Sequence, residues 1–173
     1  MKLALVVVVV VLAVLAAGLW LRHSQGASTG AVVAHVIDGD TIVLTSGQHV
    51  RLVQIDTPEK HKECYGDAAS ALTQQLLPAG SHVRIEQDPN LDQVDRYNRK
   101  LAYVFKGDDD LNVTLVREGA AGVWFFHGRR GRYGSELLDA VERARARHRG
   151  LWGACPLAQF NPLDSMSSGP AEG

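Results

Sequence analysis

The sequence predicts an α+β domain built around a small antiparallel β-barrel, and two observations carry this prediction. Three runs rich in β-branched residues are followed by a helical segment, two further strands and two helices, all within about 125 residues. The chain has 173 residues and is 46% hydrophobic, which suits one well-buried domain and leaves little room for a second. We therefore expect one folded domain over residues 31–158.

An apolar segment precedes this domain. Residues 3–21 contain no charged side chain and, as a helix, would extend about 28 Å, which is enough to cross a bilayer. A signal peptide is the alternative, because the small residues Val14 and Ala16 could frame a cleavage site. We expect residues 1–22 to be a membrane anchor or a signal segment and residues 23–30 to be a linker. The domain is then exported, either anchored to the membrane outside the cytoplasm or secreted.

The first strands of the barrel are predicted from β-branched runs. Strands are expected at 32–37 and Thr41–Leu44, joined by Asp38-Gly39 in a type I′ hairpin turn. A third strand is expected at roughly 49–55. Residues 66–77 then change to a helical period, with Ala68, Leu72 and Leu76 on one stripe.

The second half of the domain continues with strands at His82–Glu86 and 100–105, separated by a polar loop. Asp110 is expected to cap a helix that ends near Glu118, and Ser135 to cap a longer helix that ends near residue 148. On the longer helix, the apolar side chains face inward and the arginines face outward. These apolar residues are Leu137, Val141 and Ala144. Residues 159–173 are rich in Ser, Gly and Pro, which predicts a disordered tail.

Residues 50–59 change abruptly from an apolar strand to a charged stretch. Arg51 lies inside the strand, where an unpaired guanidinium would be costly to bury, so an anionic partner is expected. Asp56 and Glu59 follow at the end of the strand, and Pro58 fixes the path of the chain between them. Because Arg51 and Asp56 have opposite parity, a bulge, a sharp bend or an early end of the strand must lie between them if their side chains are to meet.

Acidic oxygens near this stretch suggest a metal site. Asp40 in the first hairpin would join Asp56 and Glu59, and a carboxylate set without Cys or His favours calcium over zinc. An EF-hand is excluded, because Ile42 and His49 occupy positions that need oxygen ligands.

A second charged stretch, residues 95–100, carries three cations before a strand. It could be a simple surface turn, but Arg99 together with Arg51 would supply two forked donors, which suit a phosphate. The net charge of -1 argues against a protein that coats nucleic acid by overall charge, so contact with a polyanion must come from a local patch. Residues 129–149 hold seven arginines against three acids and are either such a patch or a solvated helix face.

Six segments between residues 31 and 155 resemble the staphylococcal nuclease (thermonuclease) family, in the order of that family. They are VIDGDTIVL, VRLVQIDTPE, CYGDAASALTQQLL, DRYNRKLAYVF, LNVTLVREGAAGV and GLWGAC. The resemblance implies a five-stranded OB-fold barrel with three helices. It also implies a calcium-dependent endonuclease that hydrolyses DNA and RNA and leaves 3′-phosphate ends. The alternative is a catalytically inactive OB-fold module that binds single-stranded nucleic acid or a protein partner.

The same resemblance implies roles for individual residues. Arg51, Glu59 and Arg99 match the catalytic trio of the family, while Asp40, Asp56 and the Thr57 carbonyl match its Ca²⁺ ligands. Substrate contacts are expected from Tyr97, Arg96 and Phe125, although Phe125 and His127 stand where the family commonly has tyrosines. The expected partners are the nucleic acid substrate and the membrane, and the expected state is a monomer.

The chain has two cysteines, Cys64 and Cys155. An even number in an exported domain predicts a disulfide, which would tie the first helix to the segment after the last. A zinc site formed by His61 and Cys64 is the alternative, but it lacks further ligands nearby.

Overall fold

The computed structural model describes residues 28–171, and the predicted anchor or signal segment at 1–22 lies outside this range. Between residues 28 and 171, no helix combines the length and the apolar character that a bilayer crossing requires.

Five strands close into a barrel. Their order is β3-β2-β1-β5-β6 with antiparallel neighbours, and a parallel pairing of β3 with β6, in which Val50 lies opposite Lys100, closes the ring. This arrangement confirms the predicted five-stranded OB-fold. The strands are β1 (Ser28–Val36), β2 (Thr41–Leu44), β3 (His49–Leu52), β5 (His82–Glu86) and β6 (Lys100–Lys106), and the short β7 (Asp109–Asp110) pairs with the end of β6.

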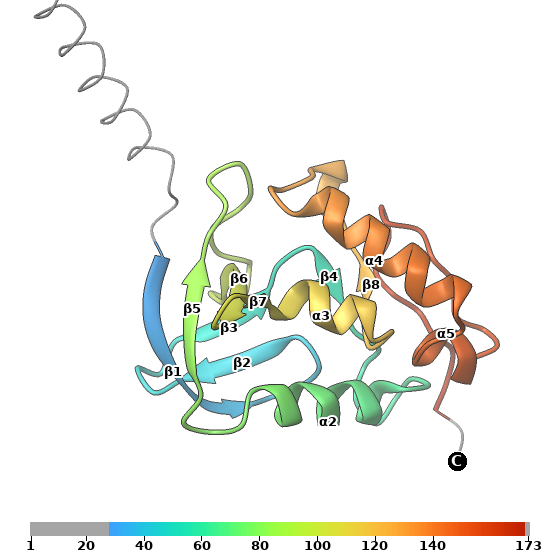
Figure 1. The fold of residues 1–173 in the computed structure, drawn as a ribbon, viewed down its shortest axis with the longest axis horizontal. Coiled ribbons are helices and arrows are strands. Elements are labelled where there is room, and N and C mark those ends of the chain that lie inside the picture. Colours follow the sequence, from blue (N-terminus) through green and yellow to red (C-terminus); the bar gives the residue numbers. More distant parts are fainter. Residues whose placement is uncertain (1–27, 172–173) are drawn as a thin grey trace, which may run out of the picture.

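β-branched and aliphatic side chains fill the barrel. Val33, Ile42, Val50, Leu52 and Val104 are fully buried, as expected for the inward positions of a closed sheet. The helices cover this core from outside: α3 packs against β6 and α4, and α2 lies across the lower edge of the barrel (Figure 1). The helices are α2 (Gly66–Leu76), α3 (Leu111–Arg117), α4 (Gly134–Ala146) and the short α5 (Leu151–Ala154).

The helix starts are only partly as predicted. Asp110 caps α3 and accepts hydrogen bonds from the N–H groups of Asn112 and Val113, which confirms that prediction. The prediction for α4 is wrong, because the helix begins at Gly134 and Ser135 lies inside it. In α2, Leu72 and Leu76 of the predicted stripe are partly buried against the core, whereas Ala68 is exposed. The fully buried side chains of this helix are Ala69, Ser70 and Thr73.

The first hairpin also differs from the prediction. Neither Asp38 nor Gly39 has a positive φ, which a type I′ turn requires, and four residues separate β1 from β2. Asp38 Oδ1 instead accepts the N–H of Asp40 at 3.1 Å. The glycine serves a close approach, because a Cβ at Gly39 would lie 2.6 Å from Thr57 Oγ1.

The predicted third strand is divided by a sharp bend. β3 ends at Leu52, and β4 (Ile55–Asp56) turns away to pair with β8 (Gly122–Val123). Gln54 lies at the bend with a φ of 65°, in the left-handed region. The chain therefore bends between Arg51 and Asp56, as their opposite parity requires if their side chains are to meet.

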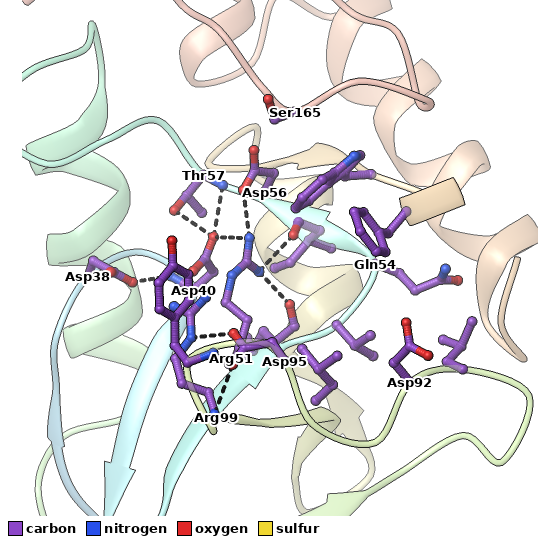
Figure 2. Close-up of a pocket in the computed structure, with 18 of the residues that line it drawn as sticks. Asp38, Asp40, Arg51, Gln54, Asp56, Thr57, Asp92, Asp95, Arg99 and Ser165 are labelled. Carbon is purple, nitrogen blue, oxygen red and sulfur yellow. Dashed lines mark hydrogen bonds and ion pairs between the residues drawn. The ribbon is translucent and has the colours of Figure 1, made fainter. Parts of the chain in front are cut away.

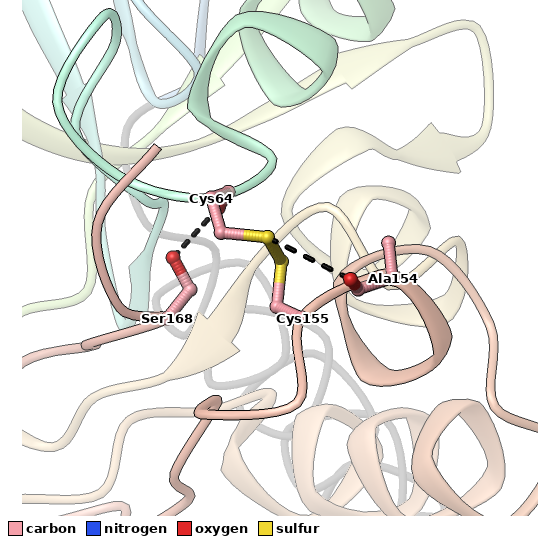
Figure 3. Close-up of a disulfide and its surroundings, with 4 residues drawn as sticks. All are labelled: Cys64, Ala154, Cys155 and Ser168. Atoms are coloured by element: carbon pink, nitrogen blue, oxygen red, sulfur yellow. Dashed lines mark hydrogen bonds between the residues drawn. A yellow bond between two sulfur atoms is a disulfide. The ribbon is translucent and has the colours of Figure 1, made fainter. Parts of the chain in front are cut away.

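The two cysteines form a disulfide. Cys64 and Cys155 are bonded, with their Cα atoms 5.9 Å apart and 91 positions apart in sequence (Figure 3). This confirms the predicted pairing and excludes Cys64 as a thiolate ligand for zinc.

The C-terminal segment differs from the predicted disordered tail. Residues 156–171 run back from α5 along the domain, and their main-chain groups bond to it. Phe125 N–H donates to the carbonyl of Pro162 at 2.7 Å, and Cys64 N–H donates to the carbonyl of Gly169 at 2.9 Å. We call residues 156–171 the C-terminal strap.

Candidate active site

A cavity of about 710 Å³ opens beside the bend between β3 and β4 (Figure 2). Four segments line it: Asp38 and Asp40 between β1 and β2, residues 51–60 at the bend, residues 91–101 in the loop before β6 and its start, and residues 124–129 after β8. Ser165 of the C-terminal strap lines one side. The cavity therefore lies where widely separated parts of the chain meet.

Arg51 is the most completely paired side chain of the cavity. Its Nη1 donates to the carbonyls of Leu52 and Ile55 at 2.7 and 2.8 Å. Its Nη2 donates to Asp56 Oδ1 at 2.6 Å and lies 3.1 Å from Asp40 Oδ2. The side chain is 10% exposed, so the anionic partners expected for a buried arginine are present.

Asp40 is buried beside Arg51 and is held by the residues after β4. Its Oδ2 accepts both the N–H and the hydroxyl of Thr57, each at 3.1 Å. Its Oδ1 accepts the hydroxyl of Thr41 at 3.1 Å. Desolvation by burial raises the pKa of Asp40 to about 6, opposed mainly by the Arg51 guanidinium. The cost of burying this carboxylate therefore exceeds the stabilisation that Arg51 gives to its charged form.

Asp56 shares Arg51 with Asp40. Its second oxygen, Oδ2, accepts the N–H of Met166 in the C-terminal strap at 2.8 Å. Burial also raises the pKa of Asp56, again against the pull of Arg51. A buried and a partly buried carboxylate thus face one guanidinium, which leaves one negative charge without a partner.

Glu59 lies at the rim, after the proline that follows Thr57. It is exposed and lines the cavity, so its carboxylate can reach both solvent and a bound molecule. Its backbone N–H donates to the side chain of Glu63 at 2.7 Å, which fixes the turn that presents it.

Arg99 enters the cavity from the loop before β6. Its Nε donates to Asp95 Oδ2 at 2.7 Å, and its Nη1 donates to Thr41 Oγ1 at 3.2 Å. Burial acts to raise the pKa of Asp95, but hydrogen bonds from Arg99 and from the Tyr97 N–H outweigh it and lower that pKa. Asp95 therefore stays ionised and orients Arg99, whose side chain is 25% exposed.

Aromatic side chains form another wall, but they are not all the predicted ones. Tyr97 is 63% exposed and lies under the guanidinium groups of Arg96 and Arg99, at 4.7 and 5.4 Å from its ring centroid. Phe125, predicted to contact substrate, is 1% exposed and does not line the cavity. Trp124 and Phe126 line it instead, and their ring centroids are 5.5 Å apart.

The shift at Phe125 follows from the alternation of an extended segment. Val123 and Phe125 are both buried, so their side chains share the core-facing side, whereas Trp124 and Phe126 take the other. Because side chains alternate along an extended chain, a buried Val123 predicts that Trp124 and Phe126 face away from the core. This signal in the sequence could have identified both residues.

The oxygen donors of the cavity suit a hard divalent cation. In the part of the chain that the structure describes, no group of three or more His, Cys, Asp or Glu is arranged to hold a metal. The carboxylates of Asp40 and Asp56 line the cavity together with Thr57. Such all-oxygen ligands favour calcium or magnesium over zinc, and the cation would offset the unpaired negative charge.

Comparisons with known proteins agree with this description. The family model described as Staphylococcal nuclease homologue matches residues 49–154. The Thermonuclease of Staphylococcus intermedius is 36% identical over 129 residues, which cover 70% of this chain and 74% of that protein. The Thermonuclease of Staphylococcus hyicus is 34% identical, with 69% and 73% covered. Endonuclease YncB of Bacillus subtilis (strain 168) is 32% identical, with 67% and 58% covered.

Proposed function

Because the chain belongs to the staphylococcal nuclease family, we propose that it is a calcium-dependent endonuclease. Its substrates are DNA and RNA, it hydrolyses their phosphodiester bonds, and it leaves 3′-phosphate ends. One observation carries the proposal: two arginines and three carboxylates from distant parts of the chain line the same cavity. These residues are Arg51, Arg99, Asp40, Asp56 and Glu59.

Asp40, Asp56 and the Thr57 carbonyl would hold the Ca²⁺ ion. When bound, the ion polarises a phosphate oxygen and helps to place the attacking water. Glu59 is the one exposed carboxylate of the set, so it is suited to accept the proton of that water. Its turn is fixed by the Glu63 contact, which limits how far the base can move.

The two arginines would stabilise the charge that grows on the phosphate oxygens in the transition state. Arg99 keeps N–H groups for this purpose, because Asp95 occupies its Nε and Thr41 accepts from Nη1 only. Arg51 differs, since both of its Nη atoms already face protein oxygens. For Arg51 to bind a phosphate, its Nη2 must give up its contact with one carboxylate and donate to the phosphate instead.

A digestion assay tests the proposal. Plasmid DNA and a defined RNA are incubated with the protein in the presence of calcium or of a chelator, and the ends of the products are analysed. Cleavage that needs calcium and yields 3′-phosphates is expected. The alternative, an inactive OB-fold module, would bind a labelled single strand and leave both substrates intact in calcium.

We also propose that the domain acts outside the cytoplasm as a monomer, tethered to the membrane by residues 1–22 or released after their cleavage. The Cys64–Cys155 disulfide supports export, because such bonds persist in oxidising compartments. The intact mass of the mature protein distinguishes tethered from cleaved chain, and sedimentation measures the oligomeric state. A full-length protein found in the cytoplasmic fraction with both thiols reduced would contradict the proposed location.

A further inference from the structure

The C-terminal strap crosses the edge of the candidate active site between two firm attachments. On one side, Phe125 N–H donates to Pro162, in the segment that also carries Phe126. On the other side, the strap bonds to residues 62–64, shortly after Glu59. The bonds there are Cys64 N–H to the Gly169 carbonyl at 2.9 Å, Ser168 Oγ to the Cys64 carbonyl at 2.6 Å, and Ala171 N–H to the Lys62 carbonyl at 2.9 Å.

Between these attachments the strap reaches Asp56. Met166 N–H donates to Oδ2 of that carboxylate at 2.8 Å, while Arg51 Nη2 donates to Oδ1 at 2.6 Å. A carboxylate has about four acceptor positions, so each oxygen keeps one position for a cation. Two donors on opposite oxygens fix the plane of the carboxylate.

The side chain of Met166 occupies a space that Gly122 leaves open. A Cβ at Gly122 would lie 2.6 Å from Met166 Sδ, so this side chain rests on the bare backbone of β8. Gly122 is paired with Asp56 itself in the β4–β8 ladder. The main chain of Met166 and its side chain therefore contact the two members of one cross-strand pair.

We propose that the Met166 N–H is a positioning group for Asp56, so that the C-terminal strap is a working part of the nuclease site. This inference rests on the proposed function. Donors that orient a ligating carboxylate commonly change metal affinity or activity by about 10- to 100-fold when removed. Met166 acts through Asp56 and does not itself contact the reacting atoms.

Replacing the peptide bond between Ser165 and Met166 by an ester removes the N–H of Met166 and keeps its side chain. The position of Cys155 makes this practical, because a synthetic peptide of residues 155–173 can be ligated at that cysteine to a thioester of residues 1–154, which restores the full chain. The matched control is an ester at Asn161, in the same strap, whose N–H makes no hydrogen bond to any described residue. Calcium alone is the probe, and calorimetry measures its affinity for each folded protein. The calcium concentration for half-maximal cleavage is measured in parallel.

We expect the Met166 ester to bind calcium about tenfold more weakly, with cleavage restored at high calcium, and the Asn161 ester to stay within about twofold of the unmodified chain. Equal calcium affinity and equal half-maximal calcium for the Met166 ester and the unmodified chain would overturn the inference. A strap that serves stability alone would lower the denaturant midpoint of the Met166 ester without changing calcium affinity, which also overturns it. An unmodified chain that cleaves neither DNA nor RNA contradicts the proposed function instead.

Discussion

Phe125 and Phe126 are adjacent, chemically identical and expected to differ completely in what they do. Phe126 is 51% exposed and lines the cavity, whereas Phe125 is 1% exposed and lies in the core. Changing each to alanine removes the same atoms from two different environments. The pair therefore tests whether the exposed face of this segment binds substrate.

The magnitudes follow from these environments. An aromatic ring that stacks on a base contributes about 1–3 kcal/mol, so Phe126→Ala should weaken binding of a single strand by about 5- to 150-fold. Its free energy of unfolding should change by less than about 1 kcal/mol, because the ring is half exposed. Phe125→Ala leaves a core cavity and should lower the free energy of unfolding by about 3–5 kcal/mol.

Two measurements separate the outcomes. Fluorescence anisotropy with a phosphorothioate oligonucleotide in calcium gives the dissociation constant, and urea denaturation gives the free energy of unfolding. The dissociation constant is measured without denaturant and corrected for the folded fraction, so the core variant serves as the matched control. If Phe125→Ala weakened binding more than Phe126→Ala while keeping its stability, the assignment of the aromatic wall would be wrong.

Three further predictions concern Arg99, the Cys64–Cys155 disulfide and Asp110. Arg99→Lys should lower kcat on DNA by about a thousandfold, because an ammonium cannot replace the forked donor, and parental kcat would remove Arg99 from the mechanism. Urea denaturation should show a loss of unfolding free energy below about 1 kcal/mol, because the Arg99–Asp95 ion pair is partly exposed. Replacing Cys64 and Cys155 by serine opens a loop spanning 91 positions and should lower the free energy of unfolding by at most about 4 to 5 kcal/mol, measured in guanidinium; an unchanged midpoint would contradict it. Burial raises the pKa of Asp110 to about 6, well above the ordinary pKa of an aspartate. The folded state therefore binds the extra proton, and its stability falls as pH rises between about 4 and 6. Asp110→Asn keeps an acceptor for the α3 cap and should flatten that pH dependence, with a gain at pH 7 of at most about 3 kcal/mol; a variant with the parental pH profile would refute the cause.

The parts of the fold that depend on side-chain pattern could be predicted from the sequence. The β-branched runs place the barrel strands, and the opposite parity of Arg51 and Asp56 requires the bend that Gln54 provides. Phe125 differs from the prediction because its expected role rests on the family resemblance, whereas its burial follows from the alternation of side chains along an extended chain. The sequence does not show which of two neighbouring aromatics faces a cavity until one buried neighbour fixes the parity.

The C-terminal strap was missed for a different reason. Residues 159–173 are mostly Ser, Gly, Pro and other polar residues with only three large apolar side chains, Phe160, Leu163 and Met166, so the composition indicates disorder. The strap is attached largely through main-chain groups of Pro162, Met166, Gly169 and Ala171, which all residue types can supply, except that proline has no N–H. Attachment of this kind leaves almost no signal in the sequence, apart from the cysteine that ties the start of the strap to residue 64.

Arg51 shows how the fold and the proposed chemistry depend on each other. Its guanidinium holds the bend through the carbonyls of Leu52 and Ile55, and it neutralises only one of the two carboxylates beside it. A cation bound by Asp40 and Asp56 would share their negative charge with Nη2, which weakens the attraction of the carboxylates for that nitrogen and makes it available to a phosphate. Cation and phosphate are therefore expected to bind with positive coupling, each raising the affinity for the other by the same factor. The carbonyl contacts of Nη1 would persist throughout, so the bend that builds the site stays intact while Nη2 changes partners.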